Sequence, residues 1–258
     1  MSSKQIHFKN SASGHQLAGI IDLPENAQPR GWALFAHCFT CGKNLKSTRH
    51  ISRALNRKQI GVLRFDFTGL GDSQGDFASS HLSSNIGDLV AAADWLKQNF
   101  QGPDILIGHS FGGAAVLQAA KLIPEARAVV TIAAPYDPQH VTHLLDNAMR
   151  EIKEKGTATV AIAGRSFTIG KEFVADLATH KSEERIRTLG RPLLVLHSPG
   201  DPVVDIDNAR LVYQAARHPK SFVSLDNTDH LLSQEADALY VGELIACWAS
   251  RYLPANNQ

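Results

Sequence analysis

A serine between two glycines could act as a nucleophile within residues 107 to 117, IGHSFGGAAVL. Ser110 follows the apolar run DILIG and precedes the helix-forming run GGAAVLQAAKL. A strand, a sharp turn and a helix in that order can hold a serine hydroxyl above a sheet edge. An ordinary helix N-cap is the alternative. The glycines favour the nucleophile, because side chains at positions 108 and 112 would collide with the neighbouring strand and helix.

A serine hydroxyl becomes a useful nucleophile only when a base takes its proton and an acid orients that base. Catalytic groups in open α/β sheets lie beyond the carboxyl ends of strands, which selects among the 12 histidines. His230 fits as the base, because it follows the strand-like run SFVSL in the loop DNTDH. His109 adjoins the serine, but neighbours on so tight a turn point apart. We predict a packing or hydrogen-bonding role for it.

Asp201 is the predicted acid. It lies in HSPGDPVV, directly after the strand-like run PLLVLH, on a Gly-Asp-Pro turn at the same sheet edge. The chain order serine, acid, histidine is the one that accompanies a strand, serine and helix turn of this kind. Asp205 and Asp207 follow closely and remain alternatives, although Asp207 is better placed as a helix N-cap.

Acyl transfer also needs two N–H donors for the developing oxyanion. One comes from the residue after the nucleophile, and the other from the loop after an earlier strand. The first is the amide of Phe111. The run WALFA leads into His37-Cys38-Phe39-Thr40, which assigns the second to the amide of Phe39. Cys38 stands where many such loops have glycine, so the register stays open by one residue.

The elements that must position these groups alternate along the chain. Eight short apolar runs are predicted strands, at residues 5–9, 16–22, 32–36, 61–66, 104–108, 128–133, 192–197 and 221–225. Most are apolar throughout, as in a parallel sheet covered on both faces, whereas the first two alternate and favour an antiparallel edge. Helical patterns fall between them, at residues 47–57, 84–99, 111–122, 206–216 and 233–251. We predict an α/β fold with a mostly parallel, doubly wound sheet in a single domain over residues 1–258.

One segment, residues 137 to 190, interrupts this alternation. It contains a charged helical pattern at 140–155, the runs TVAIA and SFTI around Gly164-Arg165, and a second helical pattern at 171–178. The two runs predict a small hairpin. An insertion of this length is typical of a lid or binding element, so we predict a cap here, with a structural decoration as the alternative.

Together these motifs resemble the α/β-hydrolase superfamily over residues 15 to 252, with Ser110, Asp201, His230 and the HCF turn in matching order. More narrowly, ALFAHCFTC, VLRFDFTGLGDSQGDF, IGHSFGGAAVL and IPEARAVVTIAAPYDPQHV are similar to the hydrolase half of bacterial proteins that fuse an α/β-hydrolase to an OsmC-type peroxide-reductase domain. The OsmC half is absent from the 258 residues, so no peroxide-reducing role is carried over. The resemblance implies hydrolysis of an ester, thioester or amide.

Composition narrows the partners. Twenty-six Lys and Arg residues nearly balance 25 Asp and Glu residues, without a long basic run, which disfavours nucleic acid. No stretch approaches the roughly 18 apolar residues of a membrane span, and the start does not read as a signal peptide. Three cysteines fit a reducing compartment, and we expect a cytoplasmic protein without a membrane partner. A single C-x-x-C is weak evidence for zinc, and no metal or other cofactor is expected.

We therefore expect a serine hydrolase acting on a small to medium acyl substrate as a carboxylesterase or thioesterase. A peptidase-like amide hydrolase and a catalytically silent ligand-binding relative are the alternatives. Cys38 and Cys41 are read either as small residues that pack the loop or as a local disulfide whose formation would tilt the amide of Phe39. The sequence leaves the substrate and the oligomeric state open.

Overall fold

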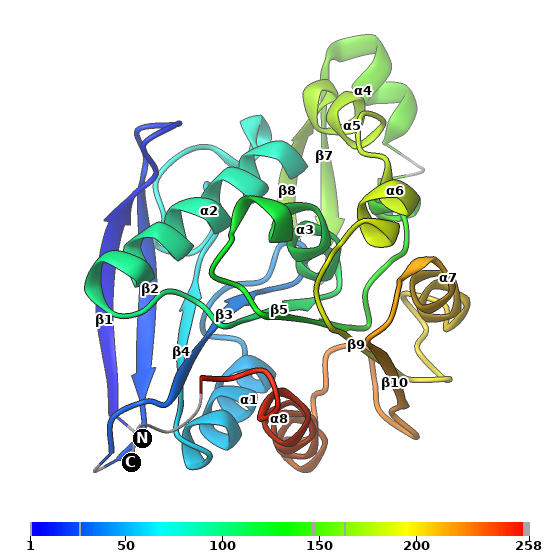
Figure 1. Ribbon diagram of the computed structural model, residues 1–258. Coiled ribbons are helices and arrows are strands. Elements are labelled where there is room, and N and C mark those ends of the chain that lie inside the picture. Colours follow the sequence, from blue (N-terminus) through cyan, green and yellow to red (C-terminus); the bar gives the residue numbers. More distant parts are fainter. Residues whose placement is uncertain (1, 26, 146–147, 163, 255–258) are drawn as a thin grey trace.

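The computed structural model describes residues 2–25, 27–145, 148–162 and 164–254, and an eight-stranded mixed sheet forms its centre (Figure 1). All eight predicted strands are confirmed, with small shifts at their ends. The strand order across the sheet is β1 (Ser2–Lys9), β2 (Gln16–Leu23), β4 (Ile60–Phe65), β3 (Gly31–Ala36), β5 (Ile105–His109), β6 (Ala128–Ile132), β9 (Leu193–His197) and β10 (Lys220–Ser224). β2 is antiparallel to β1 and β4, and the other neighbours are parallel, as predicted.

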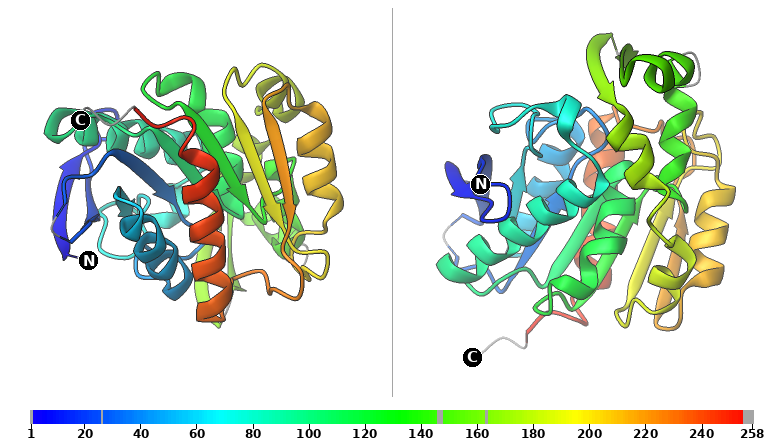
Figure 2. Two further views of the ribbon diagram at one scale, coloured as in Figure 1. Left: turned by 60° about the horizontal axis from the view of Figure 1, so that its bottom comes forward. Right: turned by 90° about the horizontal axis from the view of Figure 1, so that it is seen from above.

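Helices cover both faces of this sheet. Helices α1 (Lys46–Arg57) and α8 (Glu235–Ala249) lie side by side on one face (Figure 2, left). The other face is covered by α2 (Leu82–Asn99), α3 (Phe111–Ala119) and α7 (Asp207–Ala215). Strand β5 shows why its run is apolar throughout: Leu106 packs into the α2 and α3 layer, while Ile105 and Ile107 pack into the α1 and α8 layer. Two apolar layers therefore fix the sheet and the loops at its carboxyl edge.

The insertion between β6 and β9 forms a group of short elements, part of which lies at the top of Figure 1 and part of which contacts the helices α2, α3 and α7. The hairpin of β7 (Thr157–Ile162) and β8 (Arg165–Gly170) confirms the predicted strand pair, and α5 (Lys171–Leu177) confirms the helix after it. Helix α6 (Ser182–Arg187) was not predicted. It is six residues long and buries one apolar side chain, Ile186, so its sequence shows no helical repeat of apolar residues.

The single helix predicted over residues 140–155 is wrong. The segment instead contains a 3-10 helix, η3 (Pro138–Leu145), and the short α4 (Met149–Lys155). Each buries its own apolar side chains, Val141 and Leu145 in η3 and Ile152 in α4. The charged helical pattern therefore covers two short elements that contribute to one apolar cluster rather than a single helix.

Candidate active site

Ser110 occupies the turn between β5 and α3 with a backbone conformation that side chains rarely adopt. Its φ is 54° and its ψ is −123°, which lifts the side chain out of the path from strand to helix. The flanking glycines permit this turn. A Cβ at Gly108 would lie 2.3 Å from the carbonyl oxygen of Gly112, and one at Gly112 would lie 2.4 Å from the carbonyl oxygens of Ala36 and His37. The local sequence therefore builds a tight strand-to-helix turn around the hydroxyl.

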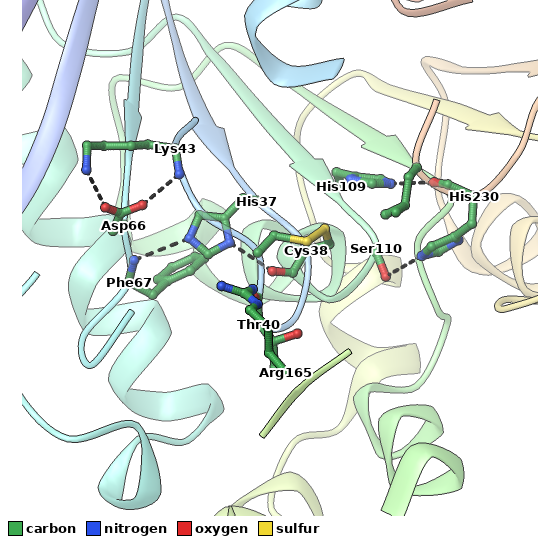
Figure 3. Close-up of a disulfide and its surroundings, with 12 residues drawn as sticks. His37, Cys38, Thr40, Lys43, Asp66, Phe67, His109, Ser110, Arg165 and His230 are labelled. Carbon is green, nitrogen blue, oxygen red and sulfur yellow. Dashed lines mark hydrogen bonds and ion pairs between the residues drawn. A yellow bond between two sulfur atoms is a disulfide. The ribbon is translucent and has the colours of Figure 1, made fainter. Parts of the chain in front are cut away.

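The three residues predicted as nucleophile, base and acid form one hydrogen-bonded line. Nε2 of His230 lies 3.0 Å from Oγ of Ser110, and its Nδ1 lies 2.8 Å from Oδ2 of Asp201. Figure 3 marks the contact between Ser110 and His230 with a dashed line. They come from the loops that follow β5, β9 and β10 at one edge of the sheet. All three residues are buried, at 8 to 9% exposure. A proton can therefore pass from the hydroxyl to a ring that a carboxylate orients.

The loop after β9 holds Asp201 in its ionised form. Burial opposes the charge, but the hydrogen bond to His230 and the backbone N–H groups of Val204 and Val203 outweigh it and lower the pKa of Asp201. Those N–H groups donate to Oδ1 at 3.0 and 2.8 Å. Asp205, the alternative acid, is exposed. The sheet edge thus presents one buried, charge-stabilised carboxylate to the histidine.

Asp207 differs from its predicted role as a helix cap. Helix α7 begins at Asp207 itself, and Ile206 occupies the position before it. The backbone N–H of Asp207 donates to Oδ1 of Asp205 at 2.8 Å, while its own carboxylate accepts from Arg210. Asp205 therefore provides the local turn that the sequence assigned to its neighbour, and neither carboxylate reaches His230 within the described part of the chain.

Two further histidines hydrogen-bond the loops that carry His230 and Asp201. His109 donates from Nε2 to the backbone carbonyl of His230 at 2.7 Å, the hydrogen-bonding role predicted for it. Burial, and then the nearby His230, lower the pKa of His109 to about 4. His197, which the sequence did not single out, donates to the carbonyl of Val204 at 2.8 Å, and burial lowers its pKa too. Two neutral imidazole rings thus stabilise, by hydrogen bonds to backbone carbonyls, the loops that carry the base and the acid.

We expect His109 to make the fold less stable in acid. Its folded pKa of about 4 lies below the ordinary value near 6.5, so between these values the unfolded chain binds a proton that the folded chain does not. The free energy of unfolding should therefore fall as pH drops from about 6.5 to 4, by up to roughly 3 kcal/mol from this group. His109→Gln keeps an N–H donor without the titration. Urea unfolding at pH 7 and pH 4.5 should show a smaller loss in this variant.

His7→Gln is the matched control, because it makes the same substitution at an exposed residue of β1, the edge strand of the sheet. Burial also lowers the pKa of His37 and His197, so some acid sensitivity should persist in His109→Gln. If acid lowers the free energy of unfolding equally in the parent and in His109→Gln, the pKa of the His109 ring is the same in the folded and unfolded states, which contradicts the prediction.

The two amides predicted as oxyanion donors belong to residues whose rings touch. The rings of Phe39 and Phe111 lie 5.3 Å apart between centroids, and Phe111 is the first residue of α3. Within the described ranges, neither backbone N–H donates to a backbone carbonyl. First-turn amides of a helix have no acceptor of their own, so the N–H of Phe111 is free for a ligand. The turn that carries Phe39 is closed by a disulfide between Cys38 and Cys41.

A buried ion pair that sequence reasoning missed anchors the end of that turn. Nζ of Lys43 lies 2.5 Å from carboxylate oxygens of both Asp66 and Asp72, and its backbone N–H donates to Asp66 at 2.6 Å. Burial opposes the charge on Lys43, but these two carboxylates raise its pKa. The sequence did not reveal this ion pair, because Lys43 is a single lysine after the turn and belongs to no recognisable motif. The ion pair between Lys43 and Asp66 connects the loop after β3 to the loop after β4 (Figure 3).

The insertion reaches this same turn. Arg165, at the start of β8, donates a hydrogen bond to the carbonyl oxygen of Thr40 and lies 5.1 Å above the ring of Phe167. From α5, the ring of Phe173 packs 5.3 Å from Phe39 and 6.0 Å from Phe111. Elements more than 100 residues apart in sequence therefore meet around the assigned oxyanion amides.

Neither a metal site nor a membrane span appears in the described part of the chain. There, no group of three or more His, Cys, Asp or Glu side chains is arranged to hold a metal ion. No described helix is both long and apolar enough to cross a bilayer.

Comparison with known proteins gives consistent matches. Residues 31–243 match the model of the Alpha/beta hydrolase family. The esterase domain of a Rhodothermus marinus protein is 48% identical, with a TM-score of 0.81 over 98% of this chain and 100% of that one. Est1E from Butyrivibrio proteoclasticus, solved with ferulic acid, is 18% identical with a TM-score of 0.80 over 96% and 98% of the chains, and shares the fold.

A curated relative is the palmitoyl-protein thioesterase ABHD10 of Rattus norvegicus, 29% identical over 189 residues, which are 70% of this chain and 63% of that protein. The chain spans less than two thirds of the length of the first curated relatives it matches. The narrower similarity to OsmC-fused hydrolases stays a prediction.

Proposed function

The chain belongs to the α/β hydrolase family, and from that premise we propose that it is a serine esterase working through an acyl-enzyme. The observation that carries the proposal is the line from Ser110 through His230 to Asp201, with hydrogen bonds of 3.0 and 2.8 Å. A silent ligand-binding relative would have no use for a serine in a strained turn aimed at a buried histidine and carboxylate.

The proposed reaction assigns one role to each group. Nε2 of His230 takes the hydroxyl proton while Oγ of Ser110 attacks the acyl carbon, and the histidine then returns the proton to the leaving group. Asp201 holds the ring and stabilises its charged form. The amides of Phe39 and Phe111 donate to the oxyanion. Water, activated by the same histidine, releases the acid and restores the serine.

The rings beside these groups favour an apolar acyl chain. Phe39, Phe77 and Phe167 are half-buried, with Phe77 5.6 Å from Phe39 and 5.1 Å from Phe167 between centroids. Such rings stabilise small to medium acyl groups by removing apolar surface from water. The similar esterase domain and the thioesterase relative agree with ester or thioester chemistry for this chain.

Fluorophosphonate labelling, followed by turnover of nitrophenyl esters from acetate to decanoate, tests this proposal. We expect labelling at one site per chain, and ester hydrolysis with an acyl-enzyme intermediate. A matching thioester and anilide would separate esterase from thioesterase and amidase. Absence of labelling together with absence of turnover on all three classes would leave the silent relative as the better description.

We also propose a single domain over residues 1–258 in which residues 137 to 190 form the cap. Removing the ring of Phe167 should widen the acyl site and shift the ratio of kcat/KM for octanoate over acetate toward the longer ester, by roughly tenfold. Tyr240→Ala is the control, since Tyr240 is exposed on α8 in the helix layer that covers the other face. An unchanged ratio in folded Phe167→Ala would favour a structural decoration.

A further inference from the structure

The assigned oxyanion donor Phe39 lies inside a four-residue ring. The Cys38–Cys41 disulfide closes the turn, and the backbone N–H of Cys41 donates to the carbonyl of Cys38 at 3.1 Å. Thr40 has a φ of 60°, a left-handed conformation that non-glycine residues keep only when surrounding contacts impose it. The direction of the Phe39 amide is therefore set by a strained turn with one covalent tie.

Other contacts hold the chain at the turn and on both sides of it without closing it covalently. His37 donates from Nδ1 to the carbonyl of Cys38 at 2.8 Å, and Nε2 of the same ring lies 3.4 Å from the backbone N of Phe67. Beyond the turn, Lys43 is bound to Asp66. Arg165 reaches the carbonyl of Thr40 from the insertion. Between these anchors, the disulfide is the link that can be made or broken chemically (Figure 3).

We propose that Cys38 and Cys41 form a thiol-sensitive site that controls acyl transfer, with the disulfide form active and the dithiol form slow. The inference rests on the proposed function, because it acts through the oxyanion amide of Phe39. In the closed turn that N–H has no backbone acceptor among the described residues and is free for the oxyanion. Opening the ring lets Thr40 leave its left-handed conformation and turns the amide away. This direction is opposite to the one expected from sequence.

The chemistry needs a dithiol or low-molecular-weight thiol as reductant. Its thiolate attacks Sγ of Cys41, which is half-buried, and the S–S bond breaks with its electron pair on Sγ of Cys38, which is buried at 4% exposure. A second thiolate, from the same dithiol or from another thiol molecule, then releases Cys41, so two electrons and two protons enter the protein and the reductant leaves as a disulfide. Hydrogen peroxide reverses the change, because it oxidises the two thiols to the disulfide and is itself reduced to two waters.

Reduction should act locally. A disulfide that closes so short a loop removes little chain entropy from the unfolded state, since this effect grows with loop length. The buried layers on both faces of the sheet do not depend on it. The dithiol protein should therefore stay folded while its turn relaxes.

The test is to treat the parent with dithiothreitol and count free thiols with a chromogenic disulfide after brief denaturation. One thiol, from Cys247, should rise to three. We expect kcat for nitrophenyl butyrate to fall at least tenfold. The fall should be smaller than the hundred- to thousandfold loss that follows complete removal of an oxyanion donor, and KM should stay within about threefold of the oxidised parent's value. Re-oxidation with mild peroxide should restore kcat. Far-ultraviolet circular dichroism should not change.

Two variants identify the cysteines responsible. Cys41→Ser should have the low kcat permanently and no response to dithiothreitol, whereas Cys247→Ser, which alters the exposed free cysteine on α8, should respond like the parent. A count of three thiols with unchanged kcat would overturn the inference, as would a thiol response that persists in Cys41→Ser. Because both outcomes require an active oxidised enzyme, they leave the proposed function standing. An oxidised parent that neither labels nor turns over would overturn both.

Discussion

Ser110→Ala is expected to abolish fluorophosphonate labelling and to lower kcat by on the order of a millionfold, the size of effect seen when a serine hydrolase loses its nucleophile. The hydroxyl is the atom that would form the acyl-enzyme, and no other Oγ is described within hydrogen-bond reach of Nε2 of His230. The change removes one oxygen from a residue with 8% exposure. Alanine meets the same backbone strain at a φ of 54°, so the fold should persist.

The measurement is gel fluorescence of the labelled protein beside its urea unfolding curve. Ser250→Ala serves as the control, because its hydroxyl donates to the backbone of Cys247 at the far end of α8. That variant should label like the parent. Labelling that survives in folded Ser110→Ala would assign the nucleophile to another side chain and overturn the reading of the turn.

Much of the fold was predictable, because the residues of a single strand or turn determine its local structure. Ile105, Leu106 and Ile107 leave no polar face on β5, and only a sheet covered on both sides accepts such a strand. Gly108 and Gly112 are likewise set by local collisions around Ser110. Where one short stretch determines the geometry, the pattern and the structure agree.

The remainder depends on partners distant in sequence. The pairing of Lys43 with Asp66 and the contact of Arg165 with Thr40 join loops that no periodicity connects. Helix α6 is held by packing against α3 and α7 rather than by a strong pattern of its own. The spacing of Cys38 and Cys41 allowed either thiols or a disulfide, because only the backbone path between them decides whether the sulfurs meet.

The second large effect concerns the acid. Asp201→Asn is expected to lower kcat by up to about ten-thousandfold, and His230→Ala by several orders of magnitude, while the fold persists. Oδ1 of Asp201 accepts the backbone N–H groups of Val203 and Val204, and Oδ2 faces Nδ1 of His230. The introduced amide must place its oxygen toward the two N–H donors. Its NH2 group then faces Nδ1.

That orientation selects the wrong form of the ring. Facing a donor, Nδ1 of His230 must be the unprotonated nitrogen, so Nε2 carries the proton and cannot accept another from Ser110. Asp205→Asn is the matched control, because Asp205 is an exposed carboxylate in the same loop and should tolerate the change. Initial rates on nitrophenyl butyrate compare the two variants. If Asp205→Asn is the crippling change and Asp201→Asn is mild, the acid is Asp205, and the buried carboxylate only supports the loop.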